Sequence, residues 1–103
     1  MMRRRLPNRR PSETFTLHWG SLKFVATASR FADGTLAEIF LSNGKCDSTA
    51  DTIARDLAVG VSIALQHGTS VETLRKALLR DARGAPSGPL GVVLDMVSDG
   101  GDA

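Results

Sequence analysis

The sequence predicts an α+β fold: a three-stranded antiparallel β-meander packed by one long helix, with a second helix and a short C-terminal helix. Three observations predict it. Apolar and polar residues alternate in three short segments of the first half, which is typical of half-buried strands. Glycine-containing turns separate these segments. The second half instead carries apolar residues at helical spacing, punctuated by glycine and proline.

The first strand is expected at residues 13–19 and the second at residues 22–29, with a Gly20-Ser21 turn between them. An Asp33-Gly34 turn then leads to the third strand, residues 36–42. The apolar residues predicted to share the inner face are Phe15, Leu17, Trp19, Leu22, Phe24, Ala26, Ala28, Ala37, Ile39 and Leu41. The third strand is partly apolar on its other face as well, through Leu36 and Phe40. That pattern indicates a central strand, or a strand whose outer face a partner covers.

Residues 48–68 form the longest apolar-periodic run and predict the long helix. Ser48 and Asp51 have the spacing of a capping box, and Gly68 suits the left-handed position after a helix end. Gly60 inside the run predicts the close approach of a second helix or a strand. The apolar stripe expected to face the sheet recurs every four residues, with alanines beside it: Ile53, Leu57, Val61, Leu65, Ala50, Ala54, Ala58 and Ala64.

A second helix is expected to open with a capping box made by Thr69 and Glu72. Its apolar stripe contains Val71, Leu74, Leu78 and Leu79, and its outer face contains Arg75, Lys76 and Arg80. Residues 81–88 form a loop, and Pro89 suits the first turn of the third helix. The residues of this helix that are predicted to close the core are Leu90, Val93, Leu94 and Val97.

The charges predict a basic arm and a separate, mildly acidic body. Residues 1–10 contain five arginines and no acidic residue: Arg3, Arg4, Arg5, Arg9 and Arg10. Subtracting these from the 13 basic side chains leaves eight against 11 acidic ones, a net charge of −3 for the rest of the chain. We therefore expect a disordered basic arm at residues 1–11, a single domain at 12–98 and a frayed tail at 99–103.

Composition excludes several classes of protein. With 42% apolar and 23% charged residues, the chain resembles an ordinary soluble domain. It has no run of about 18 apolar residues to span a membrane, so no membrane partner is predicted. The basic N-terminus lacks the apolar segment of a secretory signal. A single cysteine forms no internal disulfide and fits a reducing compartment, which predicts a cytoplasmic location.

Cys46 is the candidate functional thiol. It lies just before the long helix, where the helix dipole lowers a thiol pKa, but no pattern places His18 or His67 beside it. The alternative is an ordinary loop cysteine. Cysteine and histidine together supply too few ligands for structural zinc. The sequence therefore predicts no catalytic, cofactor-binding or metal-binding residues, and no cofactor.

Two further features are candidate binding sites. Ser87, Gly88 and Gly91 surround the predicted start of the third helix, where free N–H groups can hold an anion, although an ordinary loop and helix start is the better interpretation. The five arginines of the arm are candidate contacts for phosphates or for an acidic partner, and a simple solvated tail is the alternative.

The order of several short motifs resembles the TSCPD domain family, a module of adenosylcobalamin-dependent ribonucleotide reductases that also occurs as short standalone proteins. The matching strings are Asp33-Gly34 followed by Glu38-Ile39-Phe40, then Gly44-Lys45-Cys46-Asp47-Ser48, then residues 62–68, and finally Ser87-Gly88-Pro89-Leu90-Gly91 with Leu94-Asp95. The resemblance covers about residues 12–97. It implies a link to ribonucleotide reductase and an accessory role, because one cysteine cannot supply the several redox thiols that such a reductase needs.

Three hypotheses about function follow. The first is a non-catalytic TSCPD-like accessory or regulatory module that acts through protein–protein contact, with a reductase or as a homodimer. The second is a nucleic-acid-binding regulator that grips phosphates with its arginine arm and a second basic set, Arg75, Lys76, Arg80 and Arg83. The third is a ribonucleoside-diphosphate reductase component in which Cys46 is reactive.

Overall fold

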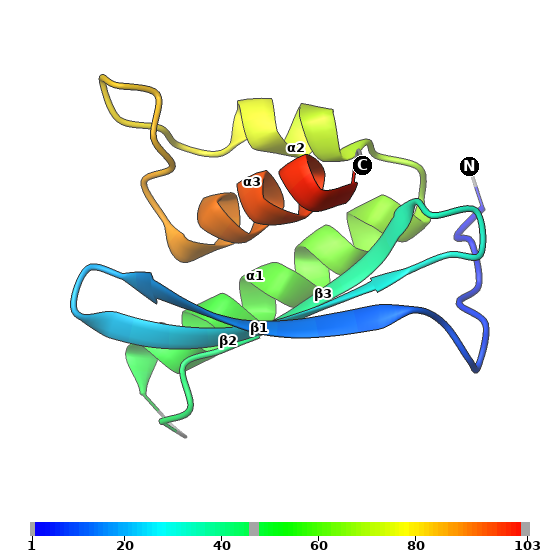
Figure 1. The fold of residues 1–103 in the computed structure, drawn as a ribbon, viewed down its shortest axis with the longest axis horizontal. Coiled ribbons are helices and arrows are strands. Elements are labelled where there is room, and N and C mark those ends of the chain that lie inside the picture. The colour runs from blue at the N-terminus through cyan, green and yellow to red at the C-terminus, as the bar shows by residue number, and fades with distance from the viewer. Residues whose placement is uncertain (1, 46–47, 102–103) are drawn as a thin grey trace.

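The computed structural model describes residues 2–45 and 48–101, with side chains described as far as Ser98. The elements follow the order β1 (Ser12–Trp19), β2 (Leu22–Arg30), β3 (Leu36–Ser42), α1 (Thr49–Gln66), α2 (Val71–Ala77) and α3 (Pro89–Gly101) (Figure 1). This confirms the α+β fold and the three-stranded meander that the alternating segments predicted. No described helix has the length and hydropathy needed to cross a membrane.

The sheet is antiparallel with the strand order β1-β2-β3. In β1–β2, Phe15 lies opposite Ala26 and Leu17 opposite Phe24, and in β2–β3 Ala28 lies opposite Ile39. Gly20 and Gly34 turn the chain between the strands with φ of 59° and 91°, which only glycine adopts without strain. The inner face therefore carries most of the apolar residues that the alternation assigned to it, while threonines, Val25 and Phe40 occupy the outer face. Leu36, which the alternation assigned to the outer face, is instead 5% exposed and part of the core, beside the register shift between Ser29 and Arg30.

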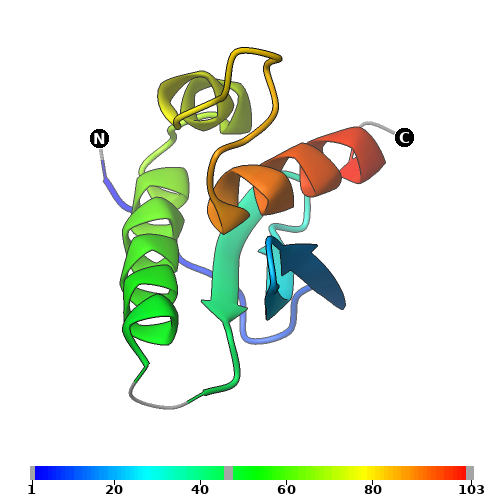
Figure 2. The same ribbon diagram turned by 90° about the vertical axis from the view of Figure 1, so that its left-hand side faces the viewer.

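The two longer helices cover different parts of the sheet. In Figure 2, α1 runs alongside β3 at one edge of the sheet, while α3 lies over the strands and α2 packs beside α3. Leu90, Val93 and Leu94 of α3 are each no more than 1% exposed and belong to the same buried cluster as Phe24 and Ile39 of the inner face. The third helix therefore closes the core as predicted, and α1 joins the same core from the side of β3.

The predicted apolar stripe of α1 is only half correct. Val61 and Leu65 are buried, but Ile53 is 61% and Leu57 42% exposed. In a helix of 3.6 residues per turn, four residues turn through about 40° more than one full turn. Each residue of the stripe therefore lies about 40° further around the helix than the one before it. Over three steps the stripe drifts off the core, and Ala54 and Ala58 take the buried places instead.

The helix caps differ in part from those expected. Ser48 caps α1 by accepting from the N–H of Asp51, and Gly68 follows the helix end with φ of 98°, both as predicted. The carboxylate of Asp51, however, is bonded to the end of β3 rather than to the cap. The cap of α2 is Ser70, which accepts from the N–H of Thr73, and not Thr69.

Candidate protein-interaction surface

Side chains of α1 close the open edge of β3. The N–H of Ile39 donates to Ser62 Oγ at 2.9 Å, and Ser62 Oγ donates in turn to the carbonyl of Ile39 at 3.0 Å. Gln66 Nε2 donates to the carbonyl of Ala37 at 3.2 Å. The unpaired backbone of an edge strand is normally left to solvent or to another strand. Here a helix takes the place of that strand, which explains why polar Ser62 and Gln66 are buried in an apolar run.

Ser62 and Gln66 are turned to β3, and the outward half of α1 carries large apolar residues beside the exposed Thr52, Arg55 and Asp56. Ile53 and Val59 are more than half exposed at 61% and 54%, and Leu57 and Ile63 are at least 40% exposed. A cluster of this kind on a surface is typical of a contact with another protein.

Gly60 lies within this outward surface. No atom lies within 4 Å of the position that a Cβ would take at Gly60, so the expected close contact with another part of this chain is absent among the described residues. The missing side chain leaves room for a partner element between Leu57 and Ile63.

Replacing Gly60 by alanine tests the open space at this position. We expect Gly60→Ala to raise the free energy of unfolding by about 0.5–1 kcal/mol, because alanine restricts the unfolded chain and favours the helix. Urea unfolding followed by circular dichroism measures the change. A loss of stability would mean that Gly60 is packed against something else in the chain.

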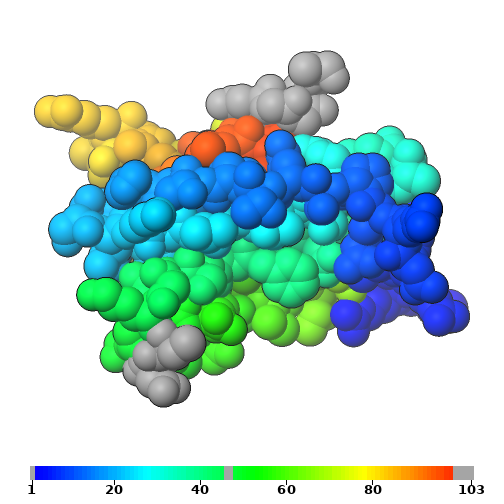
Figure 3. Space-filling view, turned by 60° about the horizontal axis from the view of Figure 1, so that its bottom comes forward, coloured from blue at the N-terminus to red at the C-terminus, as the bar shows by residue number. Residues whose placement is uncertain are grey.

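Two further exposed apolar residues lie on the outer face of the sheet. Figure 3 shows this face, on which the strands and the green surface of α1 lie side by side. Phe40 of β3 is 55% and Val25 of β2 39% exposed. A shallow hollow of about 690 Å³ lies beside Phe40 and is lined on its other side by Arg9, Arg10 and Pro11 of the arm. We call the exposed apolar residues of both elements the outer apolar surface: Val25, Phe40, Ile53, Leu57, Val59 and Ile63.

Three of the five arginines of the arm contact the domain. Arg3 Nε donates to Gln66 Oε1 at 2.6 Å. The guanidinium of Arg4 stacks on the ring of Phe31 at 3.8 Å and pairs with Asp33 at 3.1 Å. Arg10 forms an ion pair of 2.6 Å with Glu38, which is 7% exposed. Arg5 and Arg9 are exposed.

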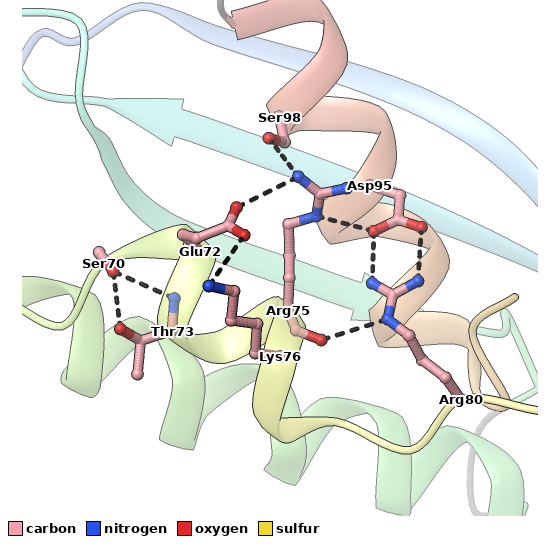
Figure 4. Close-up of polar contacts among 8 residues, drawn as sticks. All are labelled: Ser70, Glu72, Thr73, Arg75, Lys76, Arg80, Asp95 and Ser98. Carbon is pink, nitrogen blue, oxygen red and sulfur yellow. Dashed lines mark hydrogen bonds and ion pairs between the residues drawn. The ribbon is translucent and has the colours of Figure 1, made fainter. Parts of the chain in front are cut away.

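Two arginines of the second basic set turn inward, contrary to the predicted outer basic face of the second helix (Figure 4). Arg75 Nε donates to Asp95 Oδ1 at 2.9 Å, and Arg80 contacts both oxygens of Asp95 at 2.8 and 3.1 Å. Arg75 also donates to Ser98 Oγ. Lys76 pairs with Glu72 on the surface. One carboxylate on α3 thus joins α2 and the segment after it to the body of the domain.

Electrostatics agree with this geometry. Hydrogen bonds from Arg80, with further ones from Arg75, hold the pKa of Asp95 below its usual value. The hydrogen bonds that Arg80 donates to Asp95 raise the pKa of Arg80 in return. The N–H of Asn43 lowers the pKa of Asp51, and hydrogen bonds from Thr35 lower that of Asp33 to about 2. All three carboxylates are therefore held ionised as structural acceptors, whereas a general acid would need a raised pKa.

The other predicted site residues lie apart from this surface. At the start of α3, the N–H of Ser87 is already donated to the carbonyl of Leu79. Pro86 covers Gly91 so closely that a Cβ there would lie 2.8 Å from the Cβ of Pro86. Gly88 is half-buried, and an anion site at these residues stays a prediction. Cys46, the candidate thiol, lies outside the described residues.

A second hollow, of about 940 Å³, lies where the arm, the β2–β3 turn and the ends of α1 and α3 meet. Two cations line it, but Arg4 is paired with Asp33, and Arg30 donates to the carbonyls of Gly34 and Val97. Across residues 2–45 and 48–101, no group of three or more potential metal ligands gathers in one place. The outer apolar surface is therefore a feature of the described chain that its internal contacts leave unexplained.

Comparison with known proteins gives a partial relationship. Over 72 residues, or 70% of this chain, it is 35% identical to the vitamin B12-dependent ribonucleotide reductases of Streptantibioticus cattleyicolor and Streptomyces coelicolor. It is 31% identical over 70 residues to the corresponding enzyme of Agrobacterium fabrum. The chain spans only 12%, 7% and 6% of these three relatives. No family model matches the chain, and no solved structure is significantly similar to it. The chain is thus related to a short segment of these reductases.

Proposed function

We propose that this chain is a TSCPD-like accessory module that acts in the cytoplasm by binding a ribonucleotide reductase, without catalysing a reaction itself. Its similarity to a segment of vitamin B12-dependent ribonucleotide reductases supports the link to that enzyme. In those relatives the similar segment is part of a much longer polypeptide. A module with this ancestry is suited to contact the remainder of such an enzyme.

The observation that carries the proposal is the outer apolar surface. Ile53, Leu57, Val59 and Ile63 lie on one helix, and its core-facing side is already filled by other residues. Leaving four large aliphatic side chains in water costs free energy that burial against a partner would recover, about 25 cal/mol per Å² of apolar area. Gly60 between them lets a partner helix approach α1 closely.

Direct binding tests the proposal. Titrating a purified vitamin B12-dependent ribonucleotide reductase with this chain in a calorimeter is expected to show a complex. Ile53→Asp and Ile63→Asp are each expected to weaken it at least about tenfold, because each places a charge in an apolar contact. The matched control is Leu79→Asp, since Leu79 is 80% exposed but lies after α2. A complex weakened equally by all three variants, or no complex with the reductase, would contradict the proposal.

Nucleic-acid binding by the arm is the alternative function. Arg5 and Arg9 are exposed, whereas Arg3, Arg4 and Arg10 contact acceptors of the domain. Phosphate binding would have to compete with those contacts. The nucleic-acid hypothesis predicts an affinity for DNA or RNA that falls steeply as the salt concentration rises. A gel shift at about 50 mM salt tests this hypothesis, and the absence of binding would reject it.

A second alternative is a reactive Cys46 in a reductase component. Cysteine next to a helix start has a lowered thiol pKa and an enhanced reactivity. If Cys46→Ser leaves every activity of the reductase complex unchanged, the thiol has no part in it.

A further inference from the structure

The two edges of the sheet are treated differently by this chain. The edge of β3 is closed by Ser62, Gln66 and Asp51, which bond to Ile39, Ala37 and Asn43. The opposite edge belongs to β1, residues 12–19. Within the described parts of the chain, no element or side chain forms a hydrogen bond with the outward backbone of β1.

The register of the sheet identifies which groups of β1 are unpaired. Ile39 directs its N–H and carbonyl away from β2, toward Ser62, so Ala28 opposite it must direct its own groups toward β1. Ala28 lies opposite Glu13. Because backbone groups alternate in direction along a strand, Glu13, Phe15, Leu17 and Trp19 face β2. The outward N–H and carbonyl groups are those of Ser12, Thr14, Thr16 and His18.

Apart from Glu13, whose charge lies on the same face as Phe15 and Leu17, β1 lacks the features that protect an edge against another strand. Natural edge strands are blunted by proline, lysine, bulges or very short length. The eight residues SETFTLHW contain no proline, lysine or glycine, and they pair with β2 without a bulge. The apolar layer beneath β1 is also incompletely covered, since Trp19 is 37% exposed and Phe15 is half-buried.

We propose that β1 pairs antiparallel with β1 of a second copy of this chain, which joins the two sheets into one of six strands. The two-fold axis passes through Thr16, so that Thr16 lies opposite Thr16 of the second copy and Thr14 opposite its His18. This register pairs residues 13–19 of both copies and includes Trp19, which the register with its axis at Phe15, pairing residues 12–18, leaves out.

The residues that meet in this register suit one another. Phe15 lies opposite Leu17 of the second copy, and Glu13 lies opposite its Trp19. Glu13 is the one acidic residue of the strand, so no carboxylate opposes another. In the dimer, Phe15 and Trp19 of each copy become more buried, because the second copy packs against the parts of these side chains that α3 leaves exposed. Such an isologous contact is the commonest kind in homo-oligomers. It leaves the outer surface of α1 free and is independent of the proposed reductase contact.

Sedimentation equilibrium and the emission of the single tryptophan, Trp19, test the proposal together. The full chain is expected to change from monomer to dimer at micromolar concentrations, with a blue shift of Trp19 emission over the same range. Thr16→Pro removes an outward N–H at an edge position that tolerates proline in a monomer. It is expected to abolish both changes while leaving the circular dichroism spectrum intact.

A second substitution keeps the test decisive if the proline variant does not fold. Thr16→Lys brings two like charges together across the two-fold axis and is expected to weaken the dimer at least about tenfold. The control is Ile63→Asp on the outer face of α1, which is expected to dimerise as the unmodified chain does. A monomer at high micromolar concentration, or a dimer broken by Ile63→Asp and not by Thr16→Lys, would overturn the proposal.

Discussion

Replacing Ser62 by alanine is expected to lower the free energy of unfolding by about 2–3 kcal/mol, because it leaves two buried backbone groups without partners. Ser62 satisfies both the N–H and the carbonyl of Ile39, and Ile39 is 1% exposed. Alanine adds no bulk and has the higher helix propensity, so the loss reports the hydrogen bonds alone. Chemical unfolding measures the change.

The control for this variant is Thr52→Ala, an exposed position of α1 that loses a hydroxyl of similar kind. It is expected to change stability by less than about 0.5 kcal/mol. Hydrogen exchange adds a local test, since the amide of Ile39 is expected to exchange much faster in Ser62→Ala. If both variants have the same stability, α1 does not close the edge of β3 in the way described.

Asp95→Asn is expected to lower the free energy of unfolding at neutral pH by about 1–2 kcal/mol. Asp95 accepts hydrogen bonds from both Arg75 and Arg80, and its side chain is 25% exposed, so solvent screens part of the interaction. Asparagine keeps the shape but loses the charge and one of the accepting oxygens. Thermal unfolding compares the variant with Glu72→Gln, which removes a carboxylate that is 60% exposed and is expected to have a smaller effect.

The same substitution has a predicted pH dependence. Hydrogen bonds from Arg80 and Arg75 lower the pKa of Asp95 in the folded state, so the folded state favours the ionised form. The stabilisation is therefore fully present above the unfolded pKa of about 3.9 and is lost as the pH falls through the folded pKa. The stability difference between the native chain and Asp95→Asn is expected to shrink in that acidic range. A difference that stays constant would mean that the charge of Asp95 does not matter.

Local patterns were sufficient to predict the sheet. Each strand has an apolar face with a period of two, and Gly20 and Gly34 occupy turns with positive φ, so residue type and spacing determine the structure there. The caps of α1 and α2 were predicted only in part because Ser, Thr and Asp are all good caps. Thr69 and Ser70 are adjacent and both suit an N-cap, so residue type alone does not show that α2 begins after Ser70.

The surface of α1 depended on information that its own pattern does not contain. The apolar run predicted a helix, but the orientation of that helix is set by Ser62 and Gln66, which bond to a strand more than 20 residues away. Their spacing of four residues within an apolar run was the signal that one polar stripe is buried. Likewise, the local sequence predicts that Arg75 and Arg80 face solvent, because their partner Asp95 lies in the next helix and only the tertiary structure brings it beside them.

The protein described by these contacts is a small sheet with one edge closed by a helix, and that helix presents aliphatic side chains outward. The central claim is that this outward side binds another protein. The sequence contains only three isoleucines, Ile39, Ile53 and Ile63. One lies in the core and two lie on this surface, so isoleucine signals can report on both places. Ile39 is 1% exposed, whereas Ile53 and Ile63 are 61% and 40% exposed.

The most direct test is therefore the methyl NMR spectrum of the chain with labelled isoleucine, recorded while a purified vitamin B12-dependent ribonucleotide reductase is added. The account predicts that the methyl signals of Ile53 and Ile63 shift or broaden beyond detection at lower reductase concentrations than that of Ile39. Three signals that stay unchanged at saturating reductase, or a perturbation confined to Ile39, would contradict it.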